Sequence, residues 1–94
     1  MPVGILKTDL YLPHCNSLKE KRKYLNRIKD RLRAKHNVAV GELDHQDIWQ
    51  RSVLGVVTIS QSRIMVEKIL QKALAEIERT IPGDILATFQ ELVE

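Results

Sequence analysis

The stretch SLKEKRKYLNRIKDRLRAKH, residues 17–36, predicts one long amphipathic helix. Ser17 followed three residues later by Glu20 is a capping box, which satisfies free backbone N–H groups at a helix start. Apolar residues then recur at helical spacing until the pattern ends at His36. The apolar side of the predicted helix carries Leu18, Tyr24, Leu25, Ile28 and Leu32. This side requires a second layer of structure to pack against, and the segments around the helix supply one.

Strand patterns lie on both sides of this helix. Residues 3–12 alternate between apolar and polar side chains until Pro13, and residues 38–43 and 53–60 are rich in Val and Ile. The polar residues 44–47 favour a turn between the strands at residues 38–43 and 53–60. Residues 48–51 fit either a long loop or the start of the third strand. A second helix begins near Ser60 or Ser62 and ends at residues 81–83, and residues 84–92 alternate again.

The resulting order of strand, helix, strand, strand, helix, strand predicts an α+β, ferredoxin-like βαββαβ fold. At 94 residues and 10.8 kDa, the chain is expected to form a single domain over residues 1–94. Its four-stranded antiparallel sheet would have the first and third strands in the centre and both helices on one face. The residues expected to share the core are Leu10, Leu25, Ile28, Leu32, Ile69, Ala73 and Ile77.

Positive charge is concentrated in the first helix. Between Ser17 and His36 the segment carries 9 − 2 = +7, whereas the rest of the chain carries 6 − 10 = −4. The outer side of the second helix is different, because it mixes Lys68, Lys72 and Arg79 with Glu67, Glu76 and Glu78. A cationic face with few acids indicates an anionic partner, here a nucleic acid, with a solvated surface as the alternative interpretation. The predicted RNA-binding residues are Lys19, Arg22, Lys23, Arg27, Lys29 and Arg33.

Aromatic residues are too few for base reading on the sheet. Only four occur in the chain, and no aromatic pair falls on the two central strands. Any RNA binding is therefore expected to depend on the phosphate backbone. Trp49 is expected to be a packing anchor for the hairpin.

One cation, Lys21, falls inside the apolar side of the first helix. We expect its stem to pack on the core while the ammonium reaches out at the helix end or pairs with Asp9 or Asp47. In a second interpretation, Lys21 faces a bound anion at the end of the fold where the loops gather. The candidate polar site at that end comprises Lys21, Asp44, His45, Asp47 and Arg51, with turn chemistry as the alternative.

Metal and thiol chemistry have little support in the sequence. The single Cys15 and three scattered histidines give no metal-ligand spacing, so neither a metal nor a cofactor is expected. A cysteine near a helix start can have a lowered pKa and act as a nucleophile, but an incidental cysteine is the favoured interpretation here.

The second face of the sheet is also apolar. Ile5 and Tyr11 alternate out of phase with Leu6 and Leu10, and residues 53–59 are apolar in both phases. Sheets of this kind are covered on both sides, so we predict a homodimer through the open sheet face. No stretch is long and apolar enough for a membrane span, and the chain has no leader pattern at Met1, so we expect a cytoplasmic protein with no membrane contact.

Two motifs carry a family resemblance. SLKEKR at residues 17–22 and GELDHQDIWQR at residues 41–51, followed by VLGV at residues 53–56, resemble the YlxP-like family of small bacterial proteins, domain of unknown function 503. The resemblance covers nearly the whole chain and implies a ferredoxin-like fold without an established enzymatic activity. It also implies gene neighbours that encode translation initiation factor two and ribosome-binding factor A. The motif positions it puts forward are Lys21, Arg22, Asp44, His45, Gln46, Asp47, Trp49 and Arg51.

The leading hypothesis is an RNA-binding accessory factor related to ribosome function or translation, with ribosomal RNA as the expected partner. It would bind the phosphate backbone through the basic first helix. One alternative is a homodimeric protein-interaction module. Another is a phosphoryl or acyl-phosphate hydrolase with an anion site at the loop-rich end, which would need a guanidinium that residues 13–17 lack.

Overall fold

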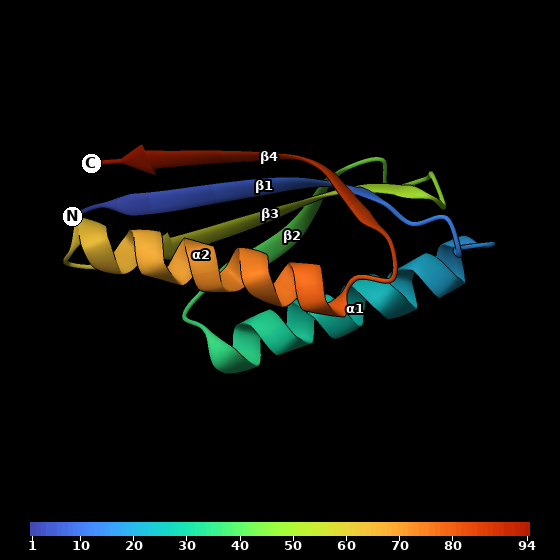
Figure 1. Cartoon of the computed structure of the whole chain (residues 1–94), viewed down its shortest axis with the longest axis horizontal. Coiled ribbons are helices and arrows are strands. Elements are labelled where there is room, and N and C mark those ends of the chain that lie inside the picture. The colour runs from blue at the N-terminus through green and yellow to red at the C-terminus, as the bar shows by residue number, and fades with distance from the viewer.

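A computed structural model describes residues 1–94 and confirms the predicted order of elements (Figure 1). The first half contains β1 (Val3–Tyr11), α1 (Leu18–Lys35) and β2 (Ala39–Asp44), and the second half contains β3 (Arg51–Ile59), α2 (Arg63–Thr80) and β4 (Asp84–Val93). The sequence leaves residues 48–51 open between a loop and the start of the third strand. In the structure residues 48–50 belong to the loop between β2 and β3, and Arg51 is the first residue of β3.

The sheet is antiparallel with the strand order β2-β3-β1-β4. The first and third strands therefore lie in the centre, as predicted. Both helices cover the same face of the sheet, with α2 against β1 and β3 and α1 against β2 and α2 (Figure 1). The fold is the predicted ferredoxin-like arrangement.

Serine caps fix the starts of both helices. The Ser17 hydroxyl accepts a hydrogen bond from the Glu20 amide at 3.1 Å, and the Ser62 hydroxyl accepts one from the Met65 amide at 3.4 Å. At the other end of α1, the His36 amide donates to the Leu32 carbonyl, and the chain then turns into extended backbone. The capping box therefore marks the start of α1 correctly.

The core lies between the sheet and the helices. Leu6 and Leu10 of β1 point toward the helices and belong to one buried cluster with residues of both helices, such as Ile28 of α1. Of the predicted core residues only Ile69 lies outside this cluster; it is half-buried on α2, so its place in the core is wrongly predicted. The cluster comprises Leu6, Leu10, Leu12, Cys15, Leu25, Ile28, Leu32, Leu54, Val56, Val66, Leu70, Ala73 and Ile77.

Glu76 is wrongly predicted to lie on the outer side of α2. It follows the buried Ala73 by three residues, so it lies on the inner side of the helix, and it is only 1% exposed. Its carboxylate meets the ammonium of Lys35 from α1 at 2.8 Å and the guanidinium of Arg79 at 3.4 Å. The hydrogen bond from Lys35 lowers the pKa of Glu76, as do the charges of Lys35 and Arg79 and a hydrogen bond from Thr80, whereas burial acts against them. Glu76 therefore joins the two helices.

The other face of the sheet, here called the open face, is not covered by any helix (Figure 1). Apolar side chains stand out from it, including Val57, Ile59, Phe89 and Val93, each between 41% and 50% exposed. The predicted apolar second face is therefore present. No helix has the length and apolar character that a membrane crossing requires.

Candidate functional site

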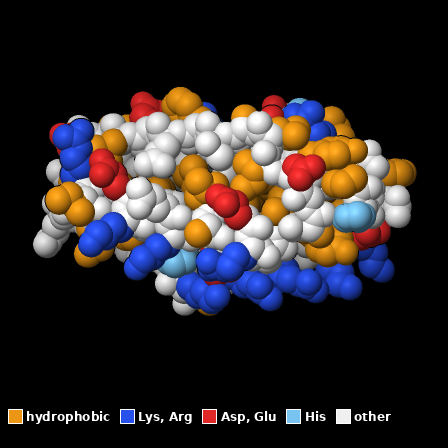
Figure 2. Space-filling view, in the orientation of Figure 1, with side chains coloured by type: hydrophobic (Ala, Val, Ile, Leu, Met, Phe, Trp, Pro, Cys, Tyr) orange, Lys and Arg blue, Asp and Glu red, His pale blue; other side chains and the backbone are white.

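The candidate nucleic-acid interface is the outer side of α1, here called the cationic face and defined by Lys19, Arg22, Lys23, Arg27, Lys29 and Arg33. Lys29 is half-buried, and the other five residues are exposed. Figure 2 shows Lys and Arg side chains gathered along the edge of the molecule that α1 forms. The six predicted residues thus lie along one helix edge.

Ion pairs reduce the charge that this helix presents. Lys21 and Lys35 are bound to acids from other elements, Glu42 and Glu76. Without these two lysines, seven of the nine basic residues of α1 remain. The acids of the helix are Glu20 and Asp30, so its remaining net charge is 7 − 2 = +5. The contact between Asp30 and Arg33 is long, at 3.9 Å, and both side chains are more than half exposed, so it offsets little of this charge.

Two of these cations have weak local contacts. The Arg33 guanidinium donates to the carbonyl of Val40 in β2 at 3.2 Å, and the Arg27 guanidinium lies 6.0 Å from the centre of the Tyr24 ring. Both side chains nevertheless remain exposed. On α2, by contrast, Arg79 is paired with Glu76 and Arg63 with Glu94. The two helices therefore differ in available charge as well as in composition.

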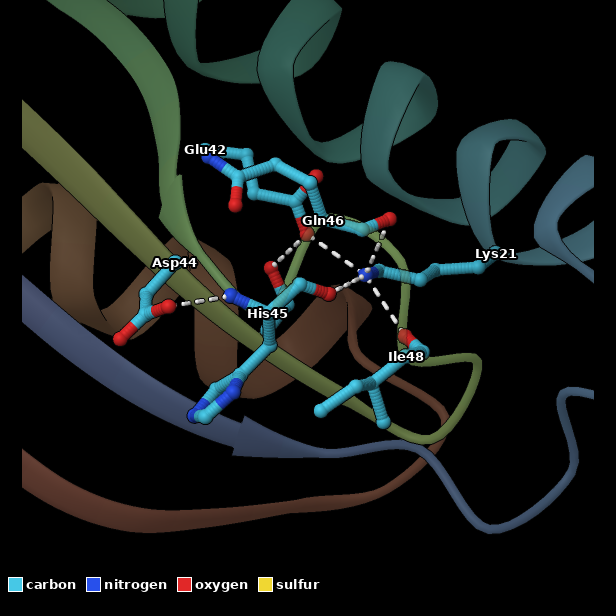
Figure 3. Close-up of polar contacts among 7 residues, drawn as sticks. Lys21, Glu42, Asp44, His45, Gln46 and Ile48 are labelled. Carbon is cyan, nitrogen blue, oxygen red and sulfur yellow. Dashed lines mark hydrogen bonds and ion pairs between the residues drawn. The ribbon is translucent and has the colours of Figure 1, made fainter.

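A second polar feature, here called the lysine clamp, is built around Lys21 (Figure 3). The side chain is 1% exposed, and its ammonium donates to the carbonyls of His45 at 2.5 Å and Ile48 at 2.7 Å. The Gln46 carbonyl lies farther away, at 3.5 Å, and the Glu42 carboxylate lies 2.8 Å from the ammonium. Lys21 thus ties the first turn of α1 to the loop between β2 and β3.

Both expectations for the Lys21 ammonium are wrong. It does not reach out at the helix end, and its acidic partner is Glu42, not Asp9 or Asp47. The register explains the choice of partner: Glu42 pairs with Leu54, whose side chain is buried under the helices, so Glu42 also faces the helix layer. Asp9 lies on the open face and holds Arg51 through two hydrogen bonds of 2.9 and 3.0 Å.

The predicted polar site therefore separates into two clusters. Lys21 meets His45 only through a backbone carbonyl, and Arg51 pairs with Asp9 on the other side of the sheet. Asp44 accepts a hydrogen bond from the His45 amide at 2.7 Å, and His45 has a φ of 62°, as a tight turn requires. Asp47 is exposed and makes no ion pair with Lys21. This geometry supports the turn-chemistry interpretation.

Sequence reasoning missed two members of the lysine clamp. Glu42 forms the ion pair with the ammonium of Lys21, and the buried Ser52 hydroxyl donates to the same carboxylate oxygen at 2.7 Å. The sequence contains a signal for Glu42, because in the alternation of side chains along β2 this residue falls on the side that faces the helices. Since the clamp satisfies the ammonium within the protein, Lys21 is not free to bind an external anion.

The family model described as "Protein of unknown function (DUF503)" matches residues 3–89. The chain belongs to the DUF503 family. A relative in this family, the uncharacterized protein YlxP of Bacillus subtilis (strain 168), is 42% identical, and the match covers 84% of this chain and 92% of the relative. The resemblance carried by residues 17–22 and 41–51 is thereby confirmed.

Solved structures share the fold of this DUF503 chain at low sequence identity. The structural-genomics protein YJCS aligns with a TM-score of 0.63 at 8% identity over 98% of this chain and 99% of its own. A designed protein with a ferredoxin fold, LFR1 1, aligns with a TM-score of 0.54 at 9% identity over 99% of this chain and 83% of its own. These likenesses concern the architecture alone.

Two further side chains of the DUF503 chain complete the picture. Cys15 is fully buried, and burial raises the pKa of its thiol; the charge of Glu20 adds to this effect and that of Lys21 opposes it. A raised thiol pKa does not suit a nucleophile. Trp49 is 50% exposed and does not belong to the core cluster, so at most half of its surface can pack on the hairpin. Its backbone is held by the hydrogen bonds of the neighbouring Ile48 and Gln50.

Proposed function

We propose that this protein binds RNA through the cationic face of α1 and serves as an accessory factor related to ribosome function or translation. The observation that carries the proposal is the net charge of +5 that α1 retains after its ion pairs are counted. Phosphate is the ligand class that such a row of Lys and Arg suits. The link to translation rests on the gene neighbours that the family resemblance implies.

The dimensions of the face suit several phosphates. Eighteen helical residues extend about 27 Å at about 1.5 Å per residue, so the cations can follow a backbone over about four to six phosphates. Contacts of this type do not read sequence. The proposed binding therefore depends on charge and salt, and little on base identity.

Two matched variants test this proposal. One replaces Lys19, Lys23 and Arg27 with Gln, and the control replaces Arg63, Lys68 and Lys72 on α2. Each contact to single-stranded RNA contributes a factor of about five at 0.1 M salt, so losing three contacts is expected to weaken binding about 100-fold. Fluorescence anisotropy with a labelled oligonucleotide measures both variants, and the control is expected to lose much less. Equal losses would show that net charge alone attracts RNA.

We also propose, as a second candidate, that a second copy of this chain covers the open face. The register places Ile59, Val3 and Val93 in one row across the sheet, and Val57, Ile5 and Glu91 in the next. Lys7 lies one row farther along β1, with its ammonium 5.4 Å from the centre of the Phe89 ring. This face is therefore mainly apolar in its first two rows, with Lys7 and Glu91 in adjacent rows and the ion pair of Asp9 with Arg51 farther along the strands.

Area and charge both favour a second copy. The face measures roughly 20 by 30 Å from strand spacing and rise, or about 600 Å² per copy, which is near the lower limit of specific interfaces. Consider a two-fold axis that lies in the interface, parallel to the rows and midway between the Ile5 row and the Lys7 row. It places the Ile5 row of one copy opposite the Lys7 row of the other. Each Lys7 then lies against the partner row that carries Glu91, so the face is complementary to itself. Both cationic faces stay outside such a dimer, because α1 lies on the opposite side of the sheet (Figure 1).

Light scattering tests the dimer. At about 0.1 mM protein we expect twice the 10.8 kDa chain mass, and Val57→Lys is expected to return the mass to that of one chain. Ile64→Lys is the matched control, because Ile64 is 66% exposed but lies on α2. A monomer mass for the unmodified protein at that concentration would overturn this candidate.

A further inference from the structure

Trp49 is the one tryptophan of the chain, and its position has no explanation in the stability of the fold. Half of the residue is exposed, and with Asp47, Ile48 and Gln50 it lines a shallow depression on the surface. No hydrogen bond or cation–π contact holds the indole. An exposed large aromatic side chain of this kind is typical of a contact site.

The backbone on both sides of Trp49 is fixed. Before it, the Ile48 carbonyl accepts from the buried ammonium of Lys21 at 2.7 Å. After it, the Gln50 carbonyl accepts from the Leu12 amide at 2.8 Å, and the Gln50 side chain reaches the Pro13 carbonyl at 3.5 Å. The indole is therefore presented to solvent from a loop anchored at two points. A preorganised contact group costs little entropy on binding.

The surroundings of Trp49 indicate the chemistry of the ligand. The lysine clamp joins this loop to the first turn of α1, where the exposed Lys19, Arg22 and Lys23 begin the cationic face. A flat aromatic surface on a loop that is tied to the start of a cationic helix suits a ligand with a flat ring and a phosphate chain, which is a nucleic acid. An apolar protein segment would use the indole but leave the cations without a partner.

We infer that Trp49 stacks on an unpaired base of RNA whose phosphates run along the cationic face. This inference rests on the proposed function and adds the class of RNA: single-stranded, because a paired base cannot offer its face to the indole. The exposed carboxylates of Asp44 and Asp47 keep phosphates away from the far side of the loop. The strand is therefore expected to leave Trp49 toward α1.

Tryptophan fluorescence gives a direct test, since Trp49 is the sole source of the signal. Titration with an unlabelled single-stranded oligonucleotide is expected to quench the emission, while a duplex of the same length is expected to leave it nearly unchanged. Trp49→Ala is expected to weaken single-stranded binding about 10- to 100-fold, and Trp49→Phe much less. Anisotropy measures these affinities, and urea unfolding confirms that both variants remain folded.

The outcomes separate this inference from the proposed function. If Trp49→Ala leaves the affinity unchanged while the triple Gln variant of α1 loses it, the stacking inference is overturned and the proposed function stands. An emission that single strands and duplexes quench equally also overturns the inference. If neither form of RNA binds the unmodified protein, both proposals fall, and the indole is left as a contact for another protein.

Discussion

Replacing Lys21 with Met removes one buried ammonium and leaves the rest of the side chain nearly unchanged in length. In the folded protein this ammonium is 1% exposed and holds two loop carbonyls at 2.5 and 2.7 Å and the Glu42 carboxylate at 2.8 Å. Methionine fills the same space but donates no hydrogen bond. The variant therefore tests the polar contacts of the lysine clamp with little change in packing.

The expected loss of unfolding free energy is large for a domain of this size. Without Lys21, the carboxylate of Glu42, which is 16% exposed, keeps only the hydroxyl of Ser52. Removing one partner of a buried ion pair costs about 3 to 5 kcal/mol, because the other charge remains buried without compensation. A small domain has about 5 to 15 kcal/mol in total, so Lys21→Met takes a large share of it.

Urea unfolding followed by far-UV circular dichroism at pH 7 measures this loss. The control is Lys21→Met combined with Glu42→Gln, which removes the stranded charge. We expect the double variant to be less destabilised than the sum of the two single variants, with a coupling of about 1 to 3 kcal/mol. A loss below about 1 kcal/mol for Lys21→Met would match an exposed ion pair and refute the reasoning.

Two further predictions concern the core and the helix pair. Ile28 is fully buried in the core, so Ile28→Ala is expected to cost about 2 to 5 kcal/mol in urea unfolding; a change no larger than that of a surface substitution would contradict the packing of α1. Glu76 has a lowered pKa in the folded state, so the stability that its ionised form contributes is present above its unfolded-state pKa and is lost as the pH falls through the folded-state value. We therefore expect Glu76→Gln to be less stable than the unmodified protein at pH 7 by about 1 to 3 kcal/mol, with the difference shrinking below about pH 4 in unfolding measured across pH. If the stability difference between Glu76→Gln and the unmodified protein does not change with pH, the ionised carboxylate of Glu76 is not its source.

Local signals in the sequence were sufficient for the fold. The Ser17 capping box, the alternation along residues 3–12 and the polar turn at residues 44–47 each act over a few residues, so a single chain displays them. The cationic face was predictable for the same reason, because helical periodicity alone assigns residues to an outer side.

Long-range pairing was not predictable in this way. The partner of Lys21 is set by the register between β2 and β3, which brings Glu42 under α1. Helical spacing from Ala73 places Glu76 on the inner side of α2, but its partner Lys35 comes from the end of α1, and periodicity on α2 carries no information about that contact. Trp49 is large and apolar and is therefore expected to pack, but half of it is exposed on the loop that is anchored at Ile48 and Gln50. Such features depend on tertiary geometry.

The salt dependence of RNA binding tests the central claim most directly. With about four to six phosphates on the cationic face, the logarithm of the association constant for single-stranded RNA is expected to fall against the logarithm of salt concentration with a slope of roughly −3 to −4. Replacing Lys19, Lys23 and Arg27 with Gln is expected to bring the slope to between about −1 and −2, while the matched α2 variant keeps the original slope. Equal slopes for all three proteins would contradict the assignment of RNA binding to α1.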